Sequence, residues 1–252
     1  GAPTTPYFSA DMPVADLHGG VGLTLMNDKL GNFNFMHARG AYSFHKPIGP
    51  TGLLGIGLEI GLLQATVEHN WLAPDGTDGL TDIAIPDRLV NRMTYDVGFG
   101  AYYRTHQLHV GISTSHLPGK AERLVATQFN YQVARHYYVL AGYDFFLSRE
   151  LTLRPSVHIK SDTAVTSFDL HCNLMYNNMI WGGISYRIQD AIAPIIGMAW
   201  EPNAKSIVKI GYAYDLGISD LKSNTHEILI NYCIKWNKPP KKQSHINPRF
   251  LR

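Results

Sequence analysis

The chain has 252 residues, of which 45% are hydrophobic and only 17% are charged, a charged share below the roughly 25% of a typical soluble domain. Its formal net charge of +2 argues against nucleic acid as a partner. No uncharged apolar stretch reaches the roughly 18 residues that a transmembrane helix needs. The composition leaves three classes open, which are a β-sandwich, a soluble β-barrel and a membrane β-barrel.

Alternation of apolar and polar residues with a period of two is the dominant pattern, and it is the signature of β-strands. Within 206–215, for example, Val208, Ile210 and Tyr212 share one face, while Lys209 and Gly211 share the other. No convincing helix interrupts these segments. The pattern predicts thirteen strands, near 6–14, 19–27, 32–45, 51–63, 93–104, 108–115, 136–147, 151–161, 166–176, 179–188, 191–200, 206–216 and 225–236.

The connections between these strands alternate in length. Every second one is tight, whereas the others include the long loops 65–92 and 116–135. Short turns at one rim and longer loops at the other are typical of outer-membrane barrels, and a β-sandwich has no reason to sort its loops in this way. We therefore expect an all-β fold, an antiparallel transmembrane β-barrel of about twelve to fourteen strands, with the long loops outside the cell.

The two faces of the predicted strands differ in charge. The apolar face is rich in large side chains, which would crowd a closed interior, so we expect it to meet lipid. Aromatic residues lie near strand ends, where an interfacial girdle would form: Tyr137, Tyr176, Trp181, Tyr186, Trp200 and Trp236. The opposite face carries the charges, and a polar network in the lumen is predicted from Arg154, His158, Asp169, Lys209, Asp215 and Glu227. By the same alternation Cys172 faces lipid and Cys233 faces inward.

No metal, cofactor or catalytic centre is predicted. Asp75, Asp78 and Asp82 give the loop 65–92 an oxygen-rich character that Ca²⁺ favours, but the spacing and closing Glu of an EF-hand are missing, and a solvated loop is the preferred interpretation. The hydroxyls that could serve a barrel lipase, such as Ser113 and Ser156, fall on the inner face. An enzyme is therefore not expected.

The C-terminal segment 237–252 differs from the rest, because it is basic, contains no acid and includes Pro239-Pro240. It cannot continue the barrel, which we place at 1–236. We predict either a disordered tail or a docking segment for a periplasmic partner. In the docking interpretation the contacts come from Lys238, Lys241, Lys242, Ile246, Arg249, Phe250 and Leu251.

Several segments together resemble the PorP/SprF family of type IX secretion membrane proteins. They include 135–138 (RHYY), 153–157 (LRPSV), 181–187 (WGGISYR) and 211–215 (GYAYD), and 22–31 is similar to an early hairpin of that family. The resemblance runs from about Gly1 to Trp236. Family members usually have one strand more before the position of Gly1, so either that first strand is missing here or the count of thirteen is off by one.

The resemblance implies an outer-membrane component of the type IX secretion machinery of a Gram-negative bacterium, which exports surface proteins, including adhesins of gliding cells. We expect a non-enzymatic anchor or adaptor between exported cargo and periplasmic partners. Its expected partners are other secretion-complex proteins, exported surface proteins and the lipid bilayer. The alternative is a transport barrel for small or hydrophobic molecules, and the bulky Tyr102, Phe146 and Met175 on the lumen face favour a filled interior over an open channel.

Overall fold

The computed structural model describes residues 3–68, 90–119, 121–123, 130–203, 205–219 and 224–234. Its main element is a single antiparallel sheet that runs in chain order. The strands along this path are β1 (Tyr7–Val14), β2 (Gly19–Leu30), β3 (Phe33–Ile48), β4 (Gly52–Val67), β5 (Val90–Arg104), β6 (Leu108–Ser115), β9 (His136–Tyr143), β11 (Leu151–Ser161), β12 (Thr166–Tyr176), β13 (Ile180–Arg187), β14 (Ala191–Asn203), β15 (Ser206–Gly217) and β16 (Thr225–Ile234).

Three further short strands and one turn of 3₁₀ helix complete the described residues. The two-residue strand β10 (Phe145–Phe146) pairs with β11, and β7 (Ala121–Arg123) pairs with β8 (Asn130–Gln132) as a separate hairpin. The 3₁₀ turn η1 (Ala15–Leu17) connects β1 to β2. No helix in the described part of the chain is long and apolar enough to cross a membrane.

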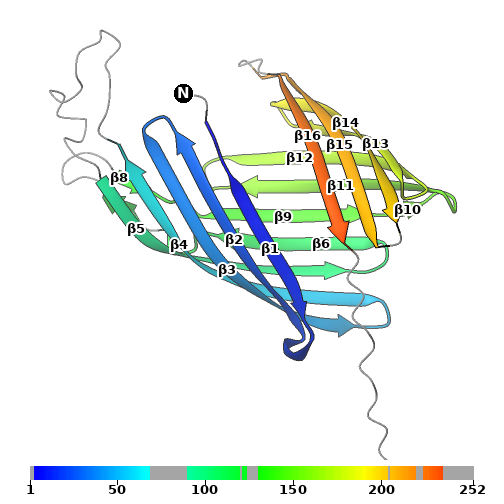
Figure 1. Cartoon of the computed structure of the whole chain (residues 1–252), viewed down its shortest axis with the longest axis horizontal. Coiled ribbons are helices and arrows are strands. Elements are labelled where there is room, and N and C mark those ends of the chain that lie inside the picture. Colours follow the sequence, from blue (N-terminus) through cyan, green and yellow to red (C-terminus); the bar gives the residue numbers. More distant parts are fainter. Residues whose placement is uncertain are drawn as a thin grey trace, which may run out of the picture.

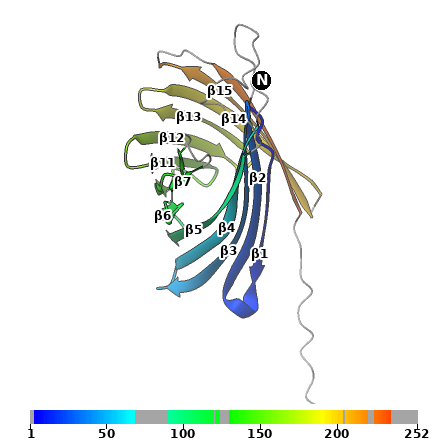
Figure 2. The ribbon, with the colours of Figure 1, turned by 90° about the vertical axis from the view of Figure 1, so that its left-hand side faces the viewer.

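The thirteen strands predicted from alternation are all present in the sheet, which confirms the all-β antiparallel fold. The sheet curves strongly, so that β1 and β16 come to the same side of the molecule with β6, β9 and β11 behind them (Figure 1). Figure 2 shows the same curvature after a quarter turn. The architecture is that of a β-barrel wall that surrounds an interior.

The two edge strands of the sheet, β1 and β16, are not hydrogen-bonded to each other. Each neighbouring pair in the path is antiparallel, and the path holds thirteen strands, so β1 and β16 run in the same direction (Figure 1). Direct pairing of these edges would be parallel. One strand lying between them would be antiparallel to both.

The connections separate into two rims. We call "turn rim" the one that carries the connections 15–18, 49–51, 105–107, 144–150, 177–179 and 204–205, and "loop rim" the opposite one, which carries 68–89 and 116–135. Residues in the left-handed region close several hairpins, among them Gly49 (φ 66°) at the turn rim and Gly31 (φ 57°) at the loop rim. Asn177 and Asn178 do the same between β12 and β13 (φ 50° and 54°), as the central pair of a tight turn in which the N–H of Met179 donates to the carbonyl of Tyr176 at 2.9 Å.

Two sequence expectations need correction. Strands β4 and β5 extend to Val67 and from Val90, so the connection between them is shorter than the predicted 65–92. The alternation persists there because Ala65 and Val67 are buried on the inner face. The predicted girdle residue Trp181 is also misplaced: a Cβ on Gly197 would meet its ring, so Trp181 lies on the inner face.

The wall presents its apolar face outward. Along β4, Ile56, Leu58 and Ile60 are exposed (Ile60 by 58%), whereas Leu63 on the opposite face is only 2% exposed. The same outward series continues on neighbouring strands, since Leu58 lies opposite Tyr42 of β3 and opposite Phe99 of β5 in register. A wall that exposes large apolar side chains in consecutive strands needs lipid as its surroundings.

At the loop rim the inner face carries an apolar cluster. It consists of the buried Leu63, Ala65 and Val67, against which Phe33, Phe35, Val90 and Val133 pack. Val133 belongs to the connection between β6 and β9, so part of this connection lies against the inner wall. The backbone N–H of Leu117 donates to the carbonyl of Val97 (3.0 Å) and fixes the other end of the same connection.

The outward orientation predicts a contrast between neighbours on β4. Leu58→Arg places a guanidinium in lipid and should destabilise the folded barrel by roughly 2–4 kcal/mol. Gly57→Arg places it on the inner face, where a side chain has room because the nearest atom to an added Cβ is 3.7 Å away. Urea unfolding in lipid vesicles measures both. Equal destabilisation by the two substitutions would contradict the assigned faces.

Candidate functional site

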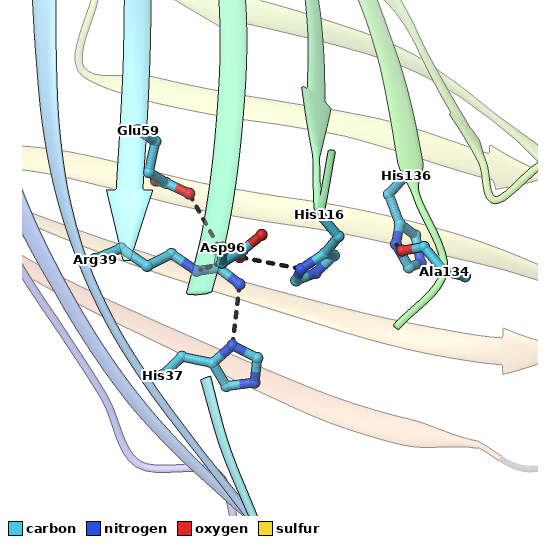
Figure 3. Close-up of polar contacts among 7 residues, drawn as sticks. All are labelled: His37, Arg39, Glu59, Asp96, His116, Ala134 and His136. Carbon is cyan, nitrogen blue, oxygen red and sulfur yellow. Dashed lines mark hydrogen bonds and ion pairs between the residues drawn. The ribbon is translucent and has the colours of Figure 1, made fainter. Parts of the chain in front are cut away.

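The inner face holds a cluster of charged and imidazole side chains on β3, β4, β5 and the segment after β6. Arg39 lies at its centre, with Nε 3.4 Å from Oδ2 of Asp96 and Nη1 3.4 Å from Oε1 of Glu59. Its Nη2 donates to Nδ1 of His37 at 3.1 Å. His116 approaches Asp96 from the other side, with 3.0 Å between Nδ1 and Oδ2 (Figure 3).

The strand register brings these residues together. Arg39, Gly61 and Asp96 are cross-strand neighbours on β3, β4 and β5. The side chain of Arg39 can therefore cross the glycine at 61 and reach Asp96, since an added Cβ at this position would meet the Arg39 side chain and the backbone of β3. Asp96 is 4% exposed. A carboxylate so deeply buried depends on its cationic neighbours.

A row of aromatic rings leads from this cluster around the wall. Ring centroids are 5.5 Å apart between His116 and His136, 6.2 Å between His136 and Tyr138, and 6.3 Å between Tyr138 and His158. Nδ1 of His136 is 3.0 Å from the carbonyl oxygen of Ala134, the contact drawn in Figure 3. The row joins the segment after β6 to β9 and β11 across the inner face.

A second ionic cluster lies beyond this row, on β11, β12 and β13. Asp169 is its acidic centre, with Oδ2 2.8 Å from Nζ of Lys160 and Oδ1 3.2 Å from Nε of Arg187. Arg187 also reaches Asp190 (Nη1 to Oδ2, 2.9 Å). His158 is the direct cross-strand neighbour of Asp169. Two of the predicted lumen residues, His158 and Asp169, are thus adjacent.

The other predicted lumen residues lie outside the two ionic clusters. Arg154 lies near the turn rim, where Nε is 3.1 Å from Oδ2 of Asp144 and Nη1 donates to Sδ of Met175 at 3.2 Å. Lys209, Asp215 and Glu227 lie on β15 and β16, and in register they face Asn231, Thr225 and Ala213. Within the described ranges no ion pair joins these three to one another or to Arg154.

Several members of the ionic clusters were missed from the sequence, namely His37, Arg39, His116 and Arg187. Strand alternation does place Arg39 and Arg187 on the inner face. Their partners depend on which residues of adjacent strands lie opposite each other, and alternation within one strand does not give that offset. His116 follows the end of β6 with a positive φ of 57°, so no strand pattern could place it.

Cys172 and Cys233 are both free. Cys172 is the cross-strand neighbour of Ile184 on the exposed face, and Cys233 is the neighbour of Ile207. In the part of the chain that the structure describes, no group of three or more His, Cys, Asp or Glu side chains could hold a metal ion. The calcium candidates Asp75, Asp78 and Asp82 and the tail residues from 237 onward lie outside the described residues.

An antiparallel wall with lipid-facing apolar side chains and paired charges inside defines a membrane β-barrel protein. Within that class, the chain belongs to the PorP/SprF family: the model of the type IX secretion system membrane protein PorP/SprF matches residues 1–232. The search of curated proteins found no match. The family resemblance noted from the sequence is confirmed, and with it the role as a membrane component of type IX secretion.

Removal of Asp96 tests the first cluster. Asp96→Ala leaves the half-buried Arg39 and His116 without their shared carboxylate and should cost about 3 kcal/mol of unfolding free energy. The exposed pair Lys29–Glu68 (3.4 Å) provides the control, since Lys29→Ala should cost at most about 1 kcal/mol. Both are measured by urea unfolding in vesicles. An Asp96→Ala loss no larger than the control loss would mean that the cluster does not stabilise the wall.

Proposed function

We propose that this protein is a non-enzymatic anchor or adaptor of the type IX secretion machinery in the bacterial outer membrane. In this role it links exported surface proteins to partners in the periplasm. The family assignment supplies the secretion system. The observation that favours an anchor over a pore is the apolar cluster at the loop rim, where Leu63 and Val67 are nearly fully buried and Val133 packs on them.

A transport barrel for small or hydrophobic molecules is the second candidate, because the inner wall also contains cavities of about 550 and 540 Å³. The two functions differ in conductance. A transport barrel reconstituted into planar bilayers conducts ions or passes solutes, whereas an anchor with a filled loop rim leaves the bilayer resistance unchanged.

The proposed orientation places the loop rim outside the cell and the turn rim in the periplasm. Single cysteines are introduced into a variant with Cys172→Ser and Cys233→Ser. Cysteines within the loop-rim connections, at 68–89 or 117–132, should react with a membrane-impermeant maleimide on whole cells. Thr51→Cys and Glu150→Cys, at the turn rim, should react only after the outer membrane is permeabilised. Whole-cell labelling at the turn rim would reverse the orientation.

We propose that the tail 237–252 contacts a periplasmic partner, because β16 ends at the turn rim and the connections there are short. Ordering this segment on binding costs conformational entropy, so its apolar residues should contribute more than its screened charges. Phe250→Ala should therefore reduce co-purification of periplasmic partners more than Lys241→Ala does, with the barrel itself unaffected. If deletion of 238–252 leaves co-purification and secretion intact, the tail has no docking role.

A further inference from the structure

The inner wall near the turn rim is hollowed, and the hollow has a distinct chemistry. One cavity of about 550 Å³ is lined by residues that include Gly55, Gly57, Tyr102 and Arg104. A second, of about 540 Å³, extends toward β1. Both are lined by Ser43, His45, Gly57, Gly100, Ser113 and Tyr138. The two cavities are therefore parts of one continuous groove across β3, β4, β5, β6 and β9.

The floor of this groove consists of small residues in register. Ser43, Gly57, Gly100 and Ser113 are successive cross-strand neighbours on β3, β4, β5 and β6. The space above Gly57 is open, since an added Cβ would meet nothing closer than 3.7 Å. Four strand spacings separate β3 from β9, which is roughly 19 Å. An extended peptide of about six residues spans that length.

The charges around the first cavity are unbalanced. Its lining contains Arg104, His45 and His158 but no carboxylate. Two carboxylates line the second cavity: Glu59 is paired with Arg39, and Asp11 lies on β1, four strands away from Arg104 in the sheet order. Asp144, near the turn rim, is paired with Arg154. Arg104 is exposed and makes no ion pair within the described ranges. The phenol groups of Tyr102 and Tyr138 add hydrogen-bond donors to the same lining.

We propose that this groove binds an extended polypeptide segment that carries carboxylates, with Arg104 as the main anchor of a carboxylate. The small floor residues allow a peptide backbone to approach the wall, and the Arg104 guanidinium offers the bidentate geometry that carboxylates accept. A bound acidic segment would be neutralised by the cation that the wall leaves unpaired. This inference does not depend on which rim faces the periplasm, so it can fail while the proposed function stands.

The probe is a fluorescein-labelled hexaglutamate peptide, titrated against the purified protein in lipid nanodiscs by fluorescence anisotropy. Hexalysine with the same label serves as the control peptide of equal length and opposite charge. We expect saturable binding of hexaglutamate that weakens as salt rises, and no saturable binding of hexalysine. Arg104→Gln should weaken binding about tenfold or more, since a charge-assisted contact is lost. Arg149→Gln, at an exposed turn outside the groove, should leave binding unchanged.

Two variants that add the same bulky side chain, one inside the groove and one on the outer face, locate the site. Gly57→Leu fills the floor of the groove and should weaken hexaglutamate binding about tenfold or more. Gly40→Leu adds the same side chain to the outer face of the neighbouring strand, where an added Cβ has room at 4.0 Å, and should change nothing. Heat-modifiable migration on gels confirms that each variant is folded. The proposal is overturned if hexaglutamate does not saturate the wild type, if hexalysine binds equally, or if Gly57→Leu binds like the wild type.

Discussion

The need to satisfy every backbone hydrogen bond inside lipid governs the rest of this structure. No water in the hydrocarbon layer can replace a lost partner, so strands must pair along their length. Thirteen consecutive strands do so here, and the pleat of each one sends successive side chains to opposite sides of the wall. The edges β1 and β16 are the exception in the described part of the chain, and their common direction means that one intervening strand would pair antiparallel with both.

The same constraint explains why charge accumulates inside. With the outer side reserved for apolar residues, charged side chains such as Arg39, Asp96 and Asp169 go to the inner face, where they need partners of opposite sign. Arg39 meets this need between Glu59 and Asp96, and Asp169 does so between Lys160 and Arg187. Arg104 is left without such a partner within the described ranges, and the cavity that it lines also contains Gly55, Gly57 and Gly100. The interior thus combines structural ion pairs with a groove in which Arg104 is left unpaired within the described ranges.

The strands and their faces could be predicted from the sequence because alternation is a local property: Leu58 and Glu59 reveal opposite faces without any knowledge of β3 or β5. Contacts between strands could not be predicted, since they depend on the pairing register, which decides which residues of two adjacent strands lie opposite each other. The pairing of Arg154 with Asp144 and the position of Trp181 over Gly197 both follow from that register. The same limit applies to Val133, which reaches the inner wall from a connection with no periodic pattern.

The most direct test of this account is a scan of spin labels along β4, with one label at a time from position 53 to 62 in reconstituted vesicles. Oxygen concentrates in lipid, whereas a polar nickel chelate stays in water, so the ratio of their collision rates reports which side each label faces. If the apolar face meets lipid, oxygen accessibility is high at positions 54, 56, 58, 60 and 62 and low between them. An oscillation of opposite phase, or none, would contradict the assignment of the apolar face to lipid.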